Sequence, residues 1–190
     1  MTVQDVAQDP NQTVNGVWVP LLLNVIDSIE QNKDNARFQF RLTNRWVDAG
    51  LSRSRIKNFF AVGQENDSRA EPFVVDSDEP AIVSGGNSAP NPMEWVLHSL
   101  ASCLTSTMVN HAAVQGIEVE SVESALEGDM DVRGMLGMSD EVRKGYNQVR
   151  VRMRVKSEAD AATLRELALF SPVYDILSSS LPVELVLEKI

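Results

Sequence analysis

The longest apolar stretch of the chain, Asn91–Gly116, constrains the fold more than any other feature. It opens with Asn91 and Pro92, a capping residue followed by proline at the first helical position, which predicts a helix start. Gly116 is a typical helix stop. Apolar residues lie on nearly every side of this predicted helix, so most of its surface has to be buried. The fold must therefore place other elements around it.

The residues before this helix predict one helix and an antiparallel meander. Residues 1–14 are polar and are expected to be disordered or loosely attached, whereas Gly16–Gln31 has the spacing of an amphipathic helix with Pro20 in its first turn. Three strand-like runs follow, separated by the polar, glycine-containing stretches 48–54 and 63–69. These runs are Arg37–Trp46, Arg55–Val62 and Glu71–Val75, and a loop rich in Gly, Ser, Asn and Pro covers 78–92.

The residues after the helix predict a mixed arrangement of strands and helices. The expected elements are strands at 117–132 and 148–156 around a loop at 134–145, a helix at 158–170, a short helix opened by Ser171 and Pro172, and a last strand at 182–189. The resulting order, β-β-β-α-β-β-α-α-β, indicates an α+β fold. We expect an N-terminal extension at 1–36 with one amphipathic helix and a single domain at 37–190.

Composition excludes several classes of function. The net charge of −10 argues against binding to a nucleic-acid backbone, and the arginines of the strand Arg150–Arg154 are expected on one face that is solvated or forms an interface. Two histidines far from any cysteine pair give no metal-ligand pattern, and no phosphate-binding loop occurs. No run reaches the ~20 apolar residues of a membrane span, and Met1–Asn15 lacks the pattern of a secretory signal. The single cysteine fits a reducing cytoplasm. We therefore expect a cytoplasmic protein that uses no metal or cofactor.

That cysteine, Cys103, lies in the middle of the apolar helix. The helical spacing puts several polar side chains on its face: Ser99, Ser106, Thr107 and Asn110, beside Leu100. These side chains either bond to their own backbone or line a small polar pocket at the sulfur. A reactive thiolate needs a nearby cation or helix N-terminus. Neither histidine reaches the sulfur, so the candidate cations are the arginines of the early strands: Arg41, Arg45, Arg53 and Arg55.

Several segments together resemble the OsmC/Ohr family, and its OsmC-like branch most closely. They are Asp76–Pro80, Gly85-Gly86, Pro92–Thr105, His111–Ile117, Leu126–Asp131 and Ser171–Val173, and the resemblance covers roughly Phe38–Ile190. It implies an intertwined homodimer with buried central helices and with sites at the subunit interface. It also implies reduction of organic hydroperoxides by a peroxidatic cysteine, which a second cysteine then resolves as a disulfide.

The resemblance assigns roles to individual residues, with two departures. Cys103 matches the peroxidatic cysteine, but the position of the resolving cysteine is Ser171, which forms no disulfide. The family's glutamate follows the helix-opening proline; Met93 stands there, and Glu94 comes one residue later, about 180° around the helix from Cys103. The family's arginine corresponds best to Arg53, with Arg55 as the second choice.

The sequence leaves two main functions open. The first is a thiol-dependent peroxidase for hydrophobic hydroperoxides, with an external thiol as reductant. Its pocket would contain Ser99, Thr107, Leu100, Met93, Glu94 and Ser171, with Met108 and Phe170 as further apolar wall. The second is a non-catalytic dimer that binds a small apolar ligand or senses oxidation at Cys103. A purely structural dimer is a third interpretation, but it leaves the polar residues beside Cys103 without a role.

Overall fold

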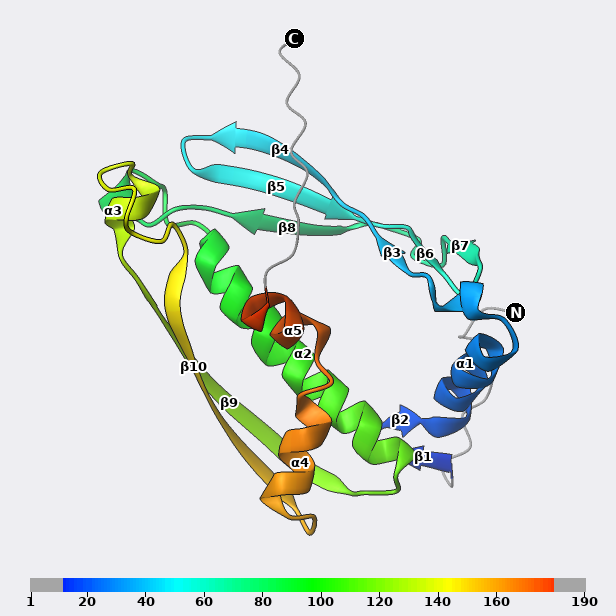
Figure 1. Cartoon of the computed structure of the whole chain (residues 1–190). Helices are drawn as coiled ribbons and strands as arrows, with labels where there is room; N and C mark the ends of the chain where they lie inside the picture. Colours follow the sequence, from blue (N-terminus) through cyan, green and yellow to red (C-terminus); the bar gives the residue numbers. More distant parts are fainter. Residues whose placement is uncertain (1–11, 180–190) are drawn as a thin grey trace. The chain divides into compact units, whose positions relative to one another are not determined.

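The computed structural model describes residues 12–179, and the chain packs into two compact units, Met1–Val96 and Leu97–Ile190 (Figure 1). Each unit is described separately below. Of the segment 1–14, expected to be disordered or loosely attached, residues 1–11 lie outside the described residues, as does the strand expected at 182–189. The expectation is wrong for Thr13–Val14, which form a paired strand. The proposed boundary between residues 36 and 37 stays a prediction. No helix in the described part is long and apolar enough to cross a membrane.

The first unit begins with a short hairpin and an amphipathic helix. Strands β1 (Thr13–Val14) and β2 (Val17–Trp18) pair across Asn15 and Gly16, whose φ angles are +55° and +76°. Two positive φ angles are what a tight hairpin turn requires, and Asn-Gly supplies them readily. Helix α1 (Val19–Gln31) follows, with Pro20 in its first turn, and then a short 3₁₀ helix, Lys33–Ala36. The prediction of a helix at 16–31 is thus confirmed from Val19 onward but wrong for its first three residues, which form the hairpin.

The predicted meander is confirmed, but it is divided into two antiparallel sheets. The first sheet has the strand order β4 (Thr43–Asp48), β5 (Leu51–Ile56), β8 (Phe73–Ser77). The second sheet has the order β3 (Gln39–Phe40), β6 (Phe59–Ala61), β7 (Gln64–Asn66). Two predicted runs are each split between the sheets. The separating stretches 48–54 and 63–69 were wrong as uninterrupted loops, because β5 begins directly after the turn at Ala49-Gly50 and β7 occupies 64–66.

A buried carboxylate organises the loop between β8 and the long helix. Asp78 is only 2% exposed. Its oxygens accept hydrogen bonds from the backbone N–H groups of Glu79, Gly86 and Ser88 and from the Ser88 hydroxyl. The chain passes so close that a Cβ on Gly85 would lie 1.8 Å from the Glu79 carbonyl oxygen, so this position requires glycine. The loop, which includes a 3₁₀ turn at Ala81–Val83, therefore leads into the helix by one defined path.

The long helix α2 (Pro92–Val114) starts where the sequence predicts. Asn91 and Glu94 form a reciprocal cap: the Asn91 side chain accepts from the Glu94 N–H at 2.8 Å, and the Glu94 carboxylate accepts from the Asn91 N–H at 2.8 Å. Trp95 adds a hydrogen bond from its indole nitrogen to the Asp76 carbonyl oxygen, 3.2 Å away. The beginning of α2 is thus tied to the end of β8.

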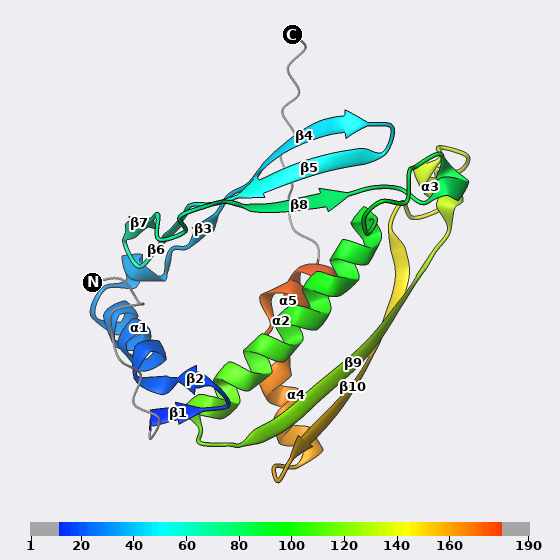
Figure 2. The same ribbon diagram turned by 180° about the vertical axis from the view of Figure 1, so that it is seen from behind.

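The second unit is built around the rest of α2. Strands β9 (Val119–Met130) and β10 (Tyr146–Ser157) pair as a long antiparallel hairpin, and helices α4 (Ala161–Ala168) and α5 (Pro172–Ser178) follow (Figure 2). The connection between the strands contains a short helix, α3 (Val132–Met135), where the sequence predicted strand and loop. The apolar face of the hairpin packs against a core formed by α2 and α4. The buried core residues are Leu100, Leu104, Met108, Ala112, Leu164, Leu167 and Ala168.

The other face of the hairpin carries charge, as predicted. Arg150 bonds to Glu127 and Asp129, Arg154 lies 3.4 Å from Glu123, and Lys156 pairs with Glu120. The alternation of β10 explains the arrangement, because Val149, Met153 and Val155 point to the core while the arginines point to solvent. Arg150 and Arg154 are matched by acidic partners on β9, whereas Arg152 is exposed and lies opposite Ala125, so the three arginines share one exposed, charged face.

Candidate functional site

Cys103 lies on α2 and is partly buried, so its sulfur is neither sealed in the core nor free on the surface. The hydroxyl oxygen of Thr107 lies one turn further along the helix, 3.9 Å from the sulfur, and either group can donate. Leu100 and Leu104, in contrast, are buried in the core. The sulfur therefore lies at the border between the apolar face of the helix and a more polar one.

The other polar residues near Cys103 have different roles. The Ser106 hydroxyl donates to the Cys103 carbonyl oxygen at 3.3 Å, which is the backbone bond expected under the simpler of the two interpretations. Ser102 lies 3.5 Å from a ring nitrogen of His98 on the exposed side of the helix. Ser99 is exposed. Thr107 thus places a hydroxyl beside the sulfur, whereas Ser106 supports the helix backbone.

The two candidate arginines lie in the first unit, on β5, and differ in their surroundings. Arg53 makes a two-point ion pair with Asp76: its Nε and Nη2 atoms lie 2.7 Å from the two carboxylate oxygens. This pairing raises the pKa of Arg53 and lowers the pKa of Asp76. Arg55 is exposed and has no ion-pair partner within residues 12–179. Arg53 is therefore a neutralised cation and Arg55 an uncompensated one.

The other two candidate arginines of the early strands, Arg41 and Arg45, also lie beside acidic or basic neighbours. Arg41 pairs with Glu65. Arg41 and Arg55, together with Lys57, line an open hollow of about 500 Å³ in the first unit. Asp76 lies opposite Arg53 in the register of β5 and β8, and Arg45 lies opposite Arg53 in the register of β4 and β5. Residues directly opposite each other share a face of the sheet, so Arg45, Arg53 and Asp76 lie on one face, with two guanidinium groups and one carboxylate.

Met93 and Glu94 lie at the start of α2. The Glu94 carboxylate accepts the Asn91 N–H as part of the helix cap, so its first role is structural. The cap accounts for the position of the Glu94 carboxylate at the start of the helix. Met93 is partly buried. Membership of Met93 and Glu94 in a pocket stays a prediction.

Ser171, at the position of the family's resolving cysteine, is 1% exposed and caps α5. Its hydroxyl oxygen accepts a hydrogen bond from the Tyr174 N–H at 3.2 Å. A serine oxygen is a strong acceptor and a preferred capping group. The side chain is therefore explained by helix capping, and a pocket role for Ser171 stays a prediction.

The second unit also contains a cavity of about 550 Å³ that sequence reasoning did not anticipate. It is lined by α2, β10, α4 and α5, and its walls are mostly aliphatic. Met108, predicted as pocket wall, does line it, whereas Phe170 stacks on His111 at 4.5 Å between ring centroids. Cys103 is not part of this lining. No local sequence pattern could have indicated the cavity, because four separate elements form it.

Comparison with known proteins places these features in context. A family model described as OsmC-like protein matches residues 85–186. The structure of an OsmC-like protein from Mycoplasma pneumoniae has a TM-score of 0.54 at 14% identity, covering 75% of this chain and 89% of that one. An OsmC-like protein of unknown function from Vibrio cholerae has a TM-score of 0.50 at 13% identity, covering 75% and 94%. No curated protein matches the sequence.

Proposed function

The chain belongs to the OsmC-like family, and on this premise we propose that it reduces organic hydroperoxides with Cys103 as the sole peroxidatic thiol. The observation that carries the proposal is the position of the Cys103 sulfur, partly exposed and in contact with the Thr107 hydroxyl. A fully buried thiol would be inaccessible to the peroxide, and a fully exposed thiol would have no neighbouring side chains held in place to assist the reaction. Thr107 can hydrogen-bond either the thiolate or the peroxide oxygen during attack.

The chemistry requires two half-reactions. The Cys103 thiolate attacks one peroxide oxygen, the O–O bond breaks, and the alkoxide leaves as an alcohol after taking a proton, so that a sulfenic acid remains. A first external thiol condenses with the sulfenic acid, releasing water and forming a mixed disulfide. A second external thiol attacks this disulfide and restores the Cys103 thiol. Because the chain has one cysteine, both thiols have to come from a reductant such as a dithiol.

We assign the cation that stabilises the thiolate to β5. Arg55 is the stronger candidate on electrostatic grounds, because the charge of Arg53 is shared with Asp76 while that of Arg55 is uncompensated. Arg53 is the better match to the family. The variants Arg53→Gln and Arg55→Gln distinguish the two candidates. The rate at which iodoacetamide alkylates Cys103 at pH 7 is measured for each variant, and the substitution that slows this reaction identifies the stabilising residue.

We further propose that the protein acts as a homodimer. Large apolar side chains are exposed on the described chain, among them Phe40, Trp46, Phe73, Phe170 and Ile176. So many large apolar side chains in contact with water favour association with a second copy of the chain. Sedimentation velocity at micromolar concentration is expected to give the mass of a dimer, and a folded monomer would contradict this.

The test of the peroxidase proposal uses the reduced protein, cumene hydroperoxide and a dimedone-based probe for sulfenic acid. We expect labelling of the wild type, no labelling of Cys103→Ser, and hydroperoxide consumption over many turnovers when dihydrolipoamide is supplied. A matched control is Cys103→Ser combined with Ser102→Cys, which moves the thiol to the exposed neighbouring position. If Cys103 is labelled no faster than this displaced thiol, the proposal is wrong.

One observation favours a non-catalytic role. The position of the family's resolving cysteine is occupied by Ser171, which caps α5, so the chain has no second thiol there. In this case Cys103 would be oxidised once and would report the oxidation through a change in packing. Stoichiometric labelling of Cys103 without turnover, in the presence of dithiol, would support this sensor.

A further inference from the structure

The cavity of the second unit has an unusual distribution of polar groups. Its aliphatic walls come from α2, β10 and α4, and include Met108, Met153 and Leu164. Two lining residues carry polar ends, Arg165 on α4 and Tyr174 on α5. The volume of about 550 Å³ falls within the roughly 300–1,000 Å³ of small-molecule sites, which are mostly apolar with a few polar groups that fix orientation.

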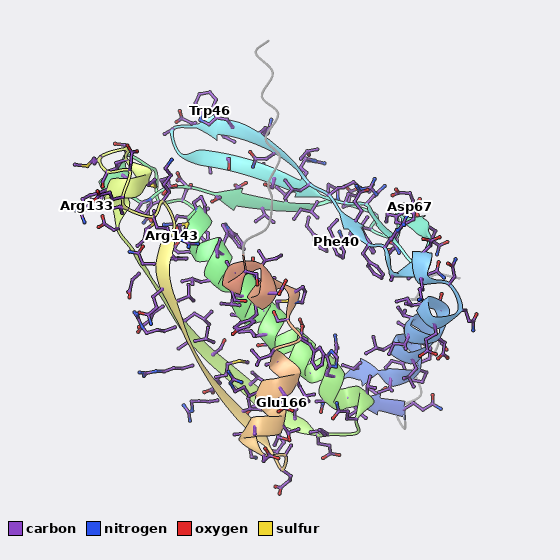
Figure 3. All side chains as sticks on the ribbon, viewed as in Figure 1. Phe40, Trp46, Asp67, Arg133, Arg143 and Glu166 are labelled. Atoms are coloured by element: carbon purple, nitrogen blue, oxygen red, sulfur yellow. The ribbon has the colours of Figure 1, made fainter. Side chains whose placement is uncertain are left out.

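Arg165 carries the single charge of the lining, and it is uncompensated. It is exposed and forms no ion pair within the described chain, although Glu166 is its neighbour on α4 (Figure 3). The Tyr174 hydroxyl has no hydrogen-bond partner among residues 12–179 either. A guanidinium can donate two parallel hydrogen bonds to a carboxylate, and a hydroxyl elsewhere in the lining can donate one more.

We propose that this cavity binds an apolar molecule that carries one carboxylate, an anionic amphiphile. The apolar body occupies the space between Met108, Met153 and Leu164, and the carboxylate pairs with Arg165. A neutral apolar molecule would fill the same space but would leave the guanidinium without a counter-charge. A second copy of the chain, packed on the cavity through apolar side chains, would also leave Arg165 unpaired, and burying an unpaired charge is costly. The site is separate from Cys103 and goes beyond the proposed peroxidase.

The test measures binding of 11-(dansylamino)undecanoic acid by its fluorescence, with laurate and dodecanol as competitors. We expect saturable binding of one probe per chain and displacement by laurate at lower concentration than by dodecanol. Arg165→Gln is expected to weaken binding of laurate by about tenfold, because it removes the charge-assisted hydrogen bonds to the carboxylate, and to leave binding of dodecanol unchanged. Ala161→Phe, at an exposed position that lines the cavity, is expected to weaken both competitors.

Arg152→Gln is the matched control. It removes the same charge from an exposed arginine on the opposite face of β10 and does not touch the cavity. If it weakens laurate binding as much as Arg165→Gln does, the effect is general electrostatics and the proposal is wrong. If the probe binds only when sedimentation shows that it dissociates a dimer, a second copy is the occupant and the proposal is equally wrong.

The outcome is separable from that of the peroxidase test. Cys103→Ser is expected to bind the probe as the wild type does. Loss of binding with intact Cys103 oxidation would overturn the amphiphile site, whereas intact binding with an inert Cys103 would support it and overturn the peroxidase.

Discussion

The two largest antiparallel arrangements of the chain, the β9–β10 hairpin and the β4-β5-β8 sheet, bury their apolar side chains to different degrees. The hairpin directs Val149, Met153 and Val155 into a core that α2 and α4 complete. In the sheet all six residues of β4 are exposed, and Trp46 stands out at 72% exposure (Figure 3). The second unit is therefore stabilised mainly by apolar packing. The sheet is held by hydrogen bonds and ion pairs, and its apolar surface fits the proposed second subunit.

The largest expected effect concerns the packed unit. Met108 is 1% exposed in the core, so Met108→Ala is expected to lower the free energy of unfolding by about 3 kcal/mol through lost contacts and a larger cavity. Urea denaturation followed by circular dichroism measures this. Met138→Ala, at a position 70% exposed, is the control and is expected to cost about 0.5 kcal/mol or less. Equal losses for the two variants would contradict the comparison.

Acid is expected to destabilise the loop that the Asp78 carboxylate organises. Hydrogen bonds from Ser88, Glu79 and Gly86 hold the pKa of Asp78 below its ordinary value of 3.8. The unfolded chain then takes up the proton more readily than the folded one, so the stabilisation is complete above about pH 4 and is lost as the pH falls further.

The measurement is thermal denaturation between pH 7 and pH 2.5. We expect Asp78→Asn, which places an amide N–H against these donors, to lower the melting temperature at pH 7 and to flatten its dependence below pH 4. Asp67→Asn, on an exposed loop residue, should leave the profile unchanged (Figure 3). An unchanged profile for Asp78→Asn would show that the loop does not depend on this carboxylate.

A smaller effect is expected at the cap of α5. Ser171→Ala removes the acceptor of the Tyr174 N–H and should destabilise the second unit by about 1 kcal/mol. Ser171→Thr keeps an acceptor and should retain most of the stability. Chemical denaturation measures the stability of both variants, and an alanine variant as stable as the wild type would show that the cap contributes nothing.

The smallest effect should occur on the charged face of the hairpin. The Lys156–Glu120 pair is largely exposed, so Lys156→Ala is expected to cost about 0.5 kcal/mol or less, and salt should reduce this further. A double-mutant cycle with Glu120→Ala at low and high salt measures the coupling. A salt-independent coupling above about 1 kcal/mol would show that ion pairs hold the hairpin as strongly as its core does.

The sequence predicted the fold best where the signals are local. Asn91 and Pro92 mark the start of α2, and Gly116 closely follows its end, because caps depend on neighbouring residues only. Strand β5 was less predictable, since its alternating Ser and Arg residues look like a polar linker. Pairing with β4 and β8 makes this segment a strand, and pairing is not a local property.

The candidate site shows the same division. Helical spacing alone brings Thr107 next to Cys103, and this contact is present. The Arg53–Asp76 pair joins residues of two strands, and its formation depends on the register of β5 and β8. Arg165 and Tyr174 line the same cavity only because residues of α2, β10, α4 and α5 meet there. Sequence periodicity contains no information about such contacts.

The cap at Ser171 has a consequence for protein engineering. Introducing a cysteine there, to give the chain an internal disulfide partner, would exchange a strong hydrogen-bond acceptor for sulfur, which accepts weakly. The first turn of α5 would loosen as the second thiol is gained. A self-sufficient redox cycle in this chain would therefore be obtained at the expense of local helix order, and a useful design would need a new capping residue beside the cysteine.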